Sequence, residues 1–167
     1  MKAIEQIYTK QEILNILKFP KNYKNAILND ATIDRRLKIK PNNPAFYSMD
    51  LELNDSYKVH FQHNNDEEFP KYTAILMLNK TLICRLDYHD GHRRSCKKEI
   101  FIDEMYEDLH IHLYCEECIQ QRFKSEAFVL NIKQEKLINF DFKCFVTLFC
   151  KIINLGCKLD CQRGLFS

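Results

Sequence analysis

Short runs in which apolar and polar residues alternate fill the middle of this chain and limit its fold more than any other feature. Alternation with a period of two is typical of strands that bury one face. Turn-forming residues separate the runs, for example 41–44 and 79–80, and the first three runs are predicted to pair in an antiparallel meander. The runs predicted to be strands are residues 33–39, 46–53, 57–61, 72–78, 82–88, 109–115 and 126–132.

Two segments have the periodicity of helices. Thr9 and Glu12 have the spacing of a capping box, which predicts a helix over residues 10–18. Apolar residues recur every three or four positions over residues 137–155, which predicts a long helix that ends at Gly156 and packs on the sheet.

These elements indicate a single α+β domain over residues 1–167. We expect an antiparallel sheet of about six to seven strands, with the N-terminal helix and the long C-terminal helix packed on one face. A chain of 167 residues buries roughly 70% of the surface of its unfolded form, so its stability requires neither metal nor disulfides. The hydrophobic fraction of 46% and the charged fraction of 29% are typical of a globular protein and exclude a disordered one.

Charge, hydropathy and cysteine content indicate the partners and the cellular compartment of the protein. The formal net charge is +2, so any contact with nucleic acid would depend on a local basic patch. No segment approaches the roughly 20 apolar residues of a membrane span, which predicts a cytoplasmic protein with no membrane partner. In the cytoplasm the eight cysteines are interpreted as buried apolar side chains, metal ligands or reactive thiols.

Alternation within two predicted strands, 82–88 and 109–115, divides their side chains between two faces. One face is apolar and is predicted to join the core; it carries Leu82, Cys84, Leu86, Tyr88, Leu109, Ile111, Leu113 and Cys115. The opposite face carries Arg85, Asp87, His89, His110, His112 and Tyr114. If the two strands are neighbours in the sheet, the second set forms one polar cluster.

Two imidazoles, a carboxylate and a guanidinium are the groups needed for metal-independent cleavage of RNA. One imidazole removes the proton of the 2′-hydroxyl and another protonates the leaving oxygen, and His110 and His112 are the candidates for these roles. Arg85 would bind phosphate, Asp87 would orient a histidine, and Tyr114 would stack on a base or hold a phosphate.

The segment between the two strands adds basic residues to this hypothesis. His89 or His92 would serve as a third acid–base candidate. The residues predicted to bind nucleic acid are His92, Arg93, Arg94, Lys97 and Lys98.

Three other interpretations use the same residues. The polar face could be solvated and carry only cross-strand ion pairs. His110 and His112 with Asp87 or His89 would make a two-histidine, one-carboxylate metal site with open positions. A structural zinc ion is a further alternative, with Cys115, Cys118, Cys157 and Cys161 as its ligands.

The sequences ICRLD at 83–87 and LHIHLYCE at 109–116, with His92 between them, resemble an uncharacterised family of small bacterial and phage proteins. Members of that family carry an R-L-D strand and an H-[LI]-H-x-Y-x-E strand, and the closing RGLF at 163–166 is also similar. A looser resemblance extends to small toxins of toxin–antitoxin modules. The resemblance implies a role in conflict between mobile elements and their hosts, with RNA as the target and an antitoxin as a partner.

The principal functional hypothesis is therefore an RNA-directed, toxin-like ribonuclease that uses no cofactor. The alternative is a non-enzymatic inhibitor of a host defence nuclease, of the anti-CRISPR type, that acts by binding the nuclease. The acidic residues 103–108, beside 66–68, would then mimic phosphate toward a basic channel.

Overall fold

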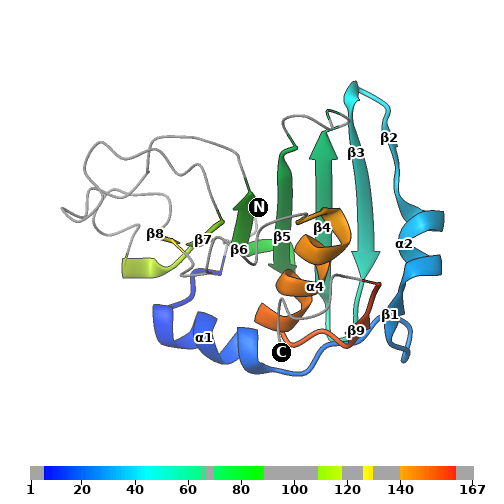
Figure 1. The fold of residues 1–167 in the computed structure, drawn as a ribbon. Coiled ribbons are helices and arrows are strands. Elements are labelled where there is room, and N and C mark those ends of the chain that lie inside the picture. Colours follow the sequence, from blue (N-terminus) through cyan, green and yellow to red (C-terminus); the bar gives the residue numbers. More distant parts are fainter. Residues whose placement is uncertain are drawn as a thin grey trace, which may run out of the picture.

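Seven strands form one antiparallel sheet within the part of the chain that the computed structural model describes, which is residues 6–64, 66, 70–88, 109–117, 126–129 (backbone only) and 140–160 (Figure 1). Each strand of this sheet pairs with the next one along the chain, and the predicted antiparallel sheet of about six to seven strands is confirmed. The strands are β2 (Lys38–Lys40), β3 (Asn43–Glu52), β4 (Tyr57–Asn64), β5 (Tyr72–Leu78), β6 (Thr81–Tyr88), β7 (His110–Leu113) and β8 (Glu126–Val129).

A separate pair of short strands joins the two halves of the chain. β1 (Leu28–Asn29) pairs in parallel with β9 (Cys157–Lys158), with Leu28 opposite Cys157. The segment after the last helix is thereby fixed to the segment that precedes the sheet.

The N-terminal helix α1 (Lys10–Lys18) has the predicted bounds. The Glu12 backbone N–H donates to Thr9 Oγ1 at 3.1 Å, and the Thr9 N–H donates to the Glu12 carboxylate at 2.7 Å. This reciprocal capping box satisfies two backbone donors that the first turn of a helix leaves without partners.

The C-terminal helix α4 (Phe142–Ile152) is shorter than predicted. Asp141 caps its start by accepting a hydrogen bond from the Cys144 N–H at 2.8 Å. Asn154 has a φ of 57°, and this left-handed conformation stops the helix before Gly156 is reached. Figure 1 shows α4 lying across β4 and β5, and ring contacts between Phe149 of α4 and Phe61 of β4 (5.6 Å between centroids) fix it there.

The strand predicted over residues 33–39 is wrong in its first part. Residues Asp30–Arg36 form the helix α2, whose start is capped by Asn29 through a hydrogen bond from the Thr32 N–H at 3.0 Å. Ile33 is therefore buried as part of the helix α2 and not of a strand. Only the last part of the run belongs to β2. A capped helix of two turns leaves too short a periodic pattern to outweigh the alternation around it.

A register shift interrupts the pairing of β5 with β6. Met77 pairs with Leu82, but Leu76 pairs with Cys84, so one residue of β6 lies between the paired positions. Leu82 consequently shares the side of Met77 and is only half-buried, which corrects its predicted place in the core. The predicted core residues beyond the shift, from Cys84 onward, are buried.

The core lies between α4 and the sheet, and the described elements form one body. Cys84, Cys115, Cys150 and Cys157 are free thiols. Cys144 is disulfide-bonded, which differs from the interpretation of the cysteines as buried apolar side chains, metal ligands or reactive thiols. None of the described helices is long and apolar enough to cross a membrane.

Candidate functional site

The predicted polar cluster is formed by neighbouring strands. β6 and β7 pair antiparallel, with Asp87 opposite His110 and Arg85 opposite His112. Since directly opposed residues project to the same face of a sheet, these four side chains lie side by side. The register therefore confirms that the sequence pattern brings together the two histidines, the carboxylate and the arginine.

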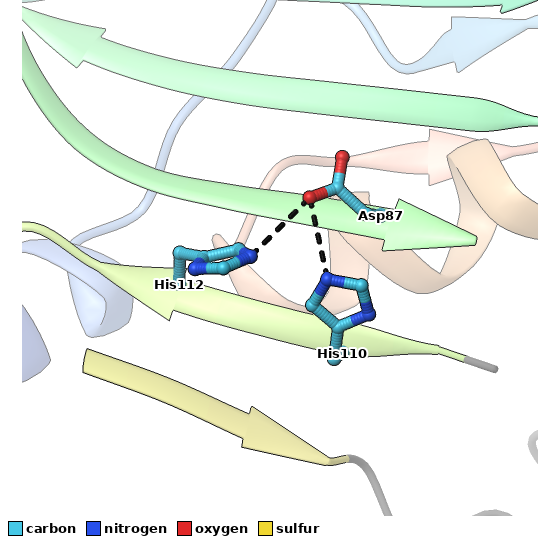
Figure 2. A group of neighbouring side chains, drawn as sticks. All are labelled: Asp87, His110 and His112. Carbon is cyan, nitrogen blue, oxygen red and sulfur yellow. Dashed lines mark ion pairs between the residues drawn. The ribbon is translucent and has the colours of Figure 1, made fainter. Parts of the chain in front are cut away.

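Both imidazoles point at one carboxylate oxygen, as Figure 2 shows. The Nε2 atom of His110 lies 3.5 Å from Asp87 Oδ2, and that of His112 lies 3.4 Å from the same oxygen. The two rings are 4.9 Å apart between centroids and inclined by 75°. Arg85 adds a third contact, with its Nε 2.8 Å from Asp87 Oδ2.

The cluster is buried, which rules out a solvated sheet face at three of its positions. Asp87 and His110 have 0% exposure and His112 has 1%. The opposite side of the same two strands is also buried, at Leu86 and Ile111. The alternation of residue types predicts which side chains share a face of the sheet. It does not predict whether a polar face is exposed to solvent or buried. Arg85 differs, because 30% of its side chain is exposed.

Burial and charge act against each other at Asp87. Burial raises the pKa of its carboxyl, but hydrogen bonds from His110 and His112 and the charge of Arg85 outweigh this effect. The pKa of Asp87 consequently lies well below its usual value, and the carboxyl is ionised at neutral pH.

Burial has the prevailing effect at His112. It lowers the pKa of the imidazole, and the nearby guanidinium of Arg85 lowers it further, whereas the contact with Asp87 opposes both only in part. The imidazole of His112 is therefore neutral at pH 7 and able to accept a proton.

Tyr114 continues the row beyond His112 and is half-buried. Burial raises the pKa of its hydroxyl, and Arg85 and Asp87 both contribute to its electrostatic environment. The hydroxyl stays protonated at neutral pH and can donate a hydrogen bond.

Thr73 is a member of the site that the sequence pattern did not reveal. It lies on β5 directly opposite Asp87, and its hydroxyl donates to Asp87 Oδ1 at 2.9 Å. The carboxylate is thus held on one oxygen by Thr73 while the other oxygen faces the histidines.

Several predicted site residues lie outside the described part of the chain. They are His89, His92, Arg93, Arg94, Lys97, Lys98, Cys118 and Cys161. The basic patch and the four-cysteine zinc site therefore stay predictions.

Among the described residues, Asp87, His110 and His112 make up the one group of three or more ligating side chains within metal-binding distance of each other, and no cysteine belongs to it. Cys115 is buried, and Cys157 instead contacts Cys150, whose hydrogen bond lowers the pKa of the Cys157 thiol.

The arrangement can hold an ionised carboxylate, transfer a proton and bind an anion at the partly exposed side chain of Arg85. Comparison of the chain with family models, with curated proteins and with solved structures finds no match. The functional assignment therefore rests on the residues and their geometry.

Proposed function

We propose that this protein is an RNA-directed, toxin-like ribonuclease that cleaves by metal-independent proton transfer. The observation that supports it best is the convergence of two imidazoles and one guanidinium on a single carboxylate oxygen, Asp87 Oδ2. General acid–base cleavage of RNA needs a base, an acid and a cation beside the phosphate, and this cluster supplies all three.

His112 is assigned as the base because burial keeps its imidazole neutral. It takes the proton of the 2′-hydroxyl while the 2′ oxygen bonds to phosphorus. The bond from phosphorus to the 5′ oxygen breaks, and His110 donates a proton to that oxygen. The products are a 2′,3′-cyclic phosphate and a 5′-hydroxyl, and Asp87 holds both imidazoles in place through its contacts with them.

Arg85 is the part of the cluster that meets the substrate first. Its side chain is 30% exposed, while its Nη2 lies 3.4 Å from His112 Nε2. A phosphate bound by this guanidinium is therefore brought next to the base. Tyr114, in the same row, donates its hydroxyl proton to the phosphate or stacks on a base.

The test uses purified protein, a fluorescent single-stranded RNA and excess EDTA. We expect wild type to cleave and the double variant His110→Ala, His112→Ala to lose at least about a hundredfold in rate, the usual contribution of acid–base catalysis. His60→Gln is the matched control, because His60 lies on β4 outside the cluster and pairs with Asp50. Cleavage retained by the double variant would overturn the assignment.

The same preparation also tests the alternative function. A nuclease inhibitor would show no cleavage, would bind a defence nuclease stoichiometrically, and would still bind it after both histidines were replaced. The acidic residues 103–108 on which that alternative rests lie outside the described part of the chain.

A further inference from the structure

Three ligand atoms from two adjacent strands meet in the buried cluster. They are one carboxylate oxygen of Asp87 and one ring nitrogen each of His110 and His112, all within 4.8 Å of one another. We propose that these residues bind a divalent first-row transition metal ion of the Zn²⁺ class, and that the ion inhibits the proton transfer assigned above. The inhibitory part rests on the proposed ribonuclease function, and the binding part does not.

Two of the three distances between the ligand atoms match a tetrahedral ion, and all three lie within 4.8 Å. Metal–nitrogen bonds of about 2.0–2.1 Å place two ligands of a tetrahedral site about 3.3 Å apart. The two separations from Asp87 Oδ2 to the imidazole nitrogens are 3.4 and 3.5 Å. The two imidazoles must therefore turn toward each other to enclose an ion together with the carboxylate. Two histidines with one carboxylate suit Zn²⁺, Co²⁺ or Fe²⁺.

The carboxylate is already held in the orientation that an ion requires. Thr73 Oγ1 donates to Asp87 Oδ1 at 2.9 Å, which turns Oδ2 toward the histidines. Such supporting hydrogen bonds strengthen metal sites because they fix the direction of the ligand before the ion arrives. Burial of all three ligands also keeps bulk water away from the ion.

Arg85 is the competitor for this site. Its Nε lies 2.8 Å from the same Asp87 Oδ2, so a dication and the guanidinium repel each other there. Because Arg85 is partly exposed, it can turn toward solvent when the ion binds. Arg85 therefore lowers the affinity for metal and keeps the cluster available for proton transfer.

Metal binding and proton transfer exclude each other at the imidazoles. An ion on Nε2 uses the lone pair of that nitrogen, and each neutral imidazole then carries its proton on Nδ1. With the ion on Nε2 and the proton on Nδ1, the imidazole of His112 has no lone pair left with which to accept a proton from RNA. Zn²⁺ should therefore stop the cleavage that proceeds in EDTA.

The experiment titrates the EDTA-treated and desalted full chain with Zn²⁺ by calorimetry, and with Co²⁺ by electronic absorption. We expect one ion per chain and the ligand-field bands of a tetrahedral ion with nitrogen and oxygen ligands. A sulfur-to-metal charge-transfer band would place the ion on cysteines and overturn the assignment. The double variant His110→Gln, His112→Gln should lose the site.

Two further variants keep the test decisive even if that double variant fails to fold. Arg85→Gln should bind Zn²⁺ at least about tenfold more tightly than wild type, because a positive charge beside the site is removed. Thr73→Val should bind about tenfold more weakly, because the carboxylate loses its orienting donor. An Arg85→Gln affinity equal to that of wild type would overturn the inference, since misfolding cannot explain a gain.

The metal-binding inference and the ribonuclease proposal can be contradicted independently of each other. Zn²⁺ binding without RNA cleavage would leave the metal inference standing and remove the ribonuclease. Cleavage in EDTA without Zn²⁺ binding at the cluster would do the reverse. Cleavage that continues with the site saturated by Zn²⁺ would overturn the inhibitory role.

Discussion

Among single residues, Asp87 is the one that both histidines, the arginine and the threonine of the site contact. Its carboxylate faces the side chains of Arg85, His110, His112 and Thr73. Its replacement by Asn keeps the shape but removes the charge that Arg85, His110 and His112 face. Breaking a buried charged pair costs about 3 kcal/mol of unfolding free energy or more. We predict this loss for Asp87→Asn in urea denaturation at pH 7.

Asp50→Asn is the matched control for that measurement. Asp50 also contacts a histidine, His60 Nδ1 at 3.0 Å, but its side chain is 53% exposed. Exposed pairs contribute little, so this variant should change the unfolding free energy by less than about 1 kcal/mol. Equal losses in the two variants would contradict the account of a buried cluster.

His63 gives a pH-dependent prediction away from the site. Its ring packs against Tyr47 (5.0 Å between centroids) and Phe142 (4.5 Å), and burial lowers its pKa. The unfolded chain binds a proton at this residue near pH 6.5, while the folded chain binds it only at lower pH. The unfolded state therefore holds more protons in that window, and stability falls as pH decreases through 6.5.

The corresponding measurement compares wild type with His63→Gln. Urea midpoints are taken at pH 7.5 and pH 5.5, and the drop between these values should be smaller in the variant. An identical drop would show that His63 stays as easily protonated in the folded protein as in the unfolded chain.

Among the elements, the ends of α1 and α4 are joined by one buried lysine. The ammonium of Lys21 donates to the backbone oxygens of Ile16 (2.6 Å), Phe19 (2.8 Å) and Ile153 (2.7 Å). Burial lowers the pKa of Lys21 to about 8, so the side chain remains protonated at pH 7. The contact satisfies carbonyls that helix ends leave without partners.

Lys21→Met keeps the length of the side chain but removes its donors. We predict a loss of about 2–3 kcal/mol in unfolding free energy, because the three carbonyls lose a charged partner. Lys18→Met, on the exposed last turn of α1, should cost less than about 0.5 kcal/mol. Thermal or urea unfolding of the three proteins decides the matter, and equal stability would contradict the proposed link.

An element could be predicted from the sequence where its residues carry a recognisable pattern, such as a capping box or an alternation of polar and apolar side chains. The capping box at Thr9 fixed the start of α1, and alternation assigned Asp87 and His110 to one face. Thr73 could not be placed, because a regular hairpin at 79–80 would set it opposite Leu86 rather than Asp87. The register shift near Leu76 moves it by one position, and no residue pattern marks that shift.

In the whole molecule, the order from β2 to β6 followed from the short connections between successive strands, which leave only neighbours to pair. The connections from β6 to β7 and from β7 to β8 are longer, so the pairing of β6 with β7 that forms the cluster required the structure. The burial of the polar cluster did not follow. Alternation reports which side chains share a face, and it contains no information on what covers that face. The residues of the site were therefore predicted from their types and their positions in the strands, while the burial of Asp87, His110 and His112 and the partial exposure of Arg85 required the structure.

The central claim is that the buried cluster cleaves RNA through attack by the neighbouring 2′-hydroxyl. One measurement tests it most directly: cleavage in EDTA of a short RNA and of the same strand with 2′-deoxy sugars, with product ends identified by mass spectrometry. We predict 2′,3′-cyclic phosphate ends from the RNA and no cleavage of the deoxy strand. Equal cleavage of both strands, or no cleavage of either, would contradict it.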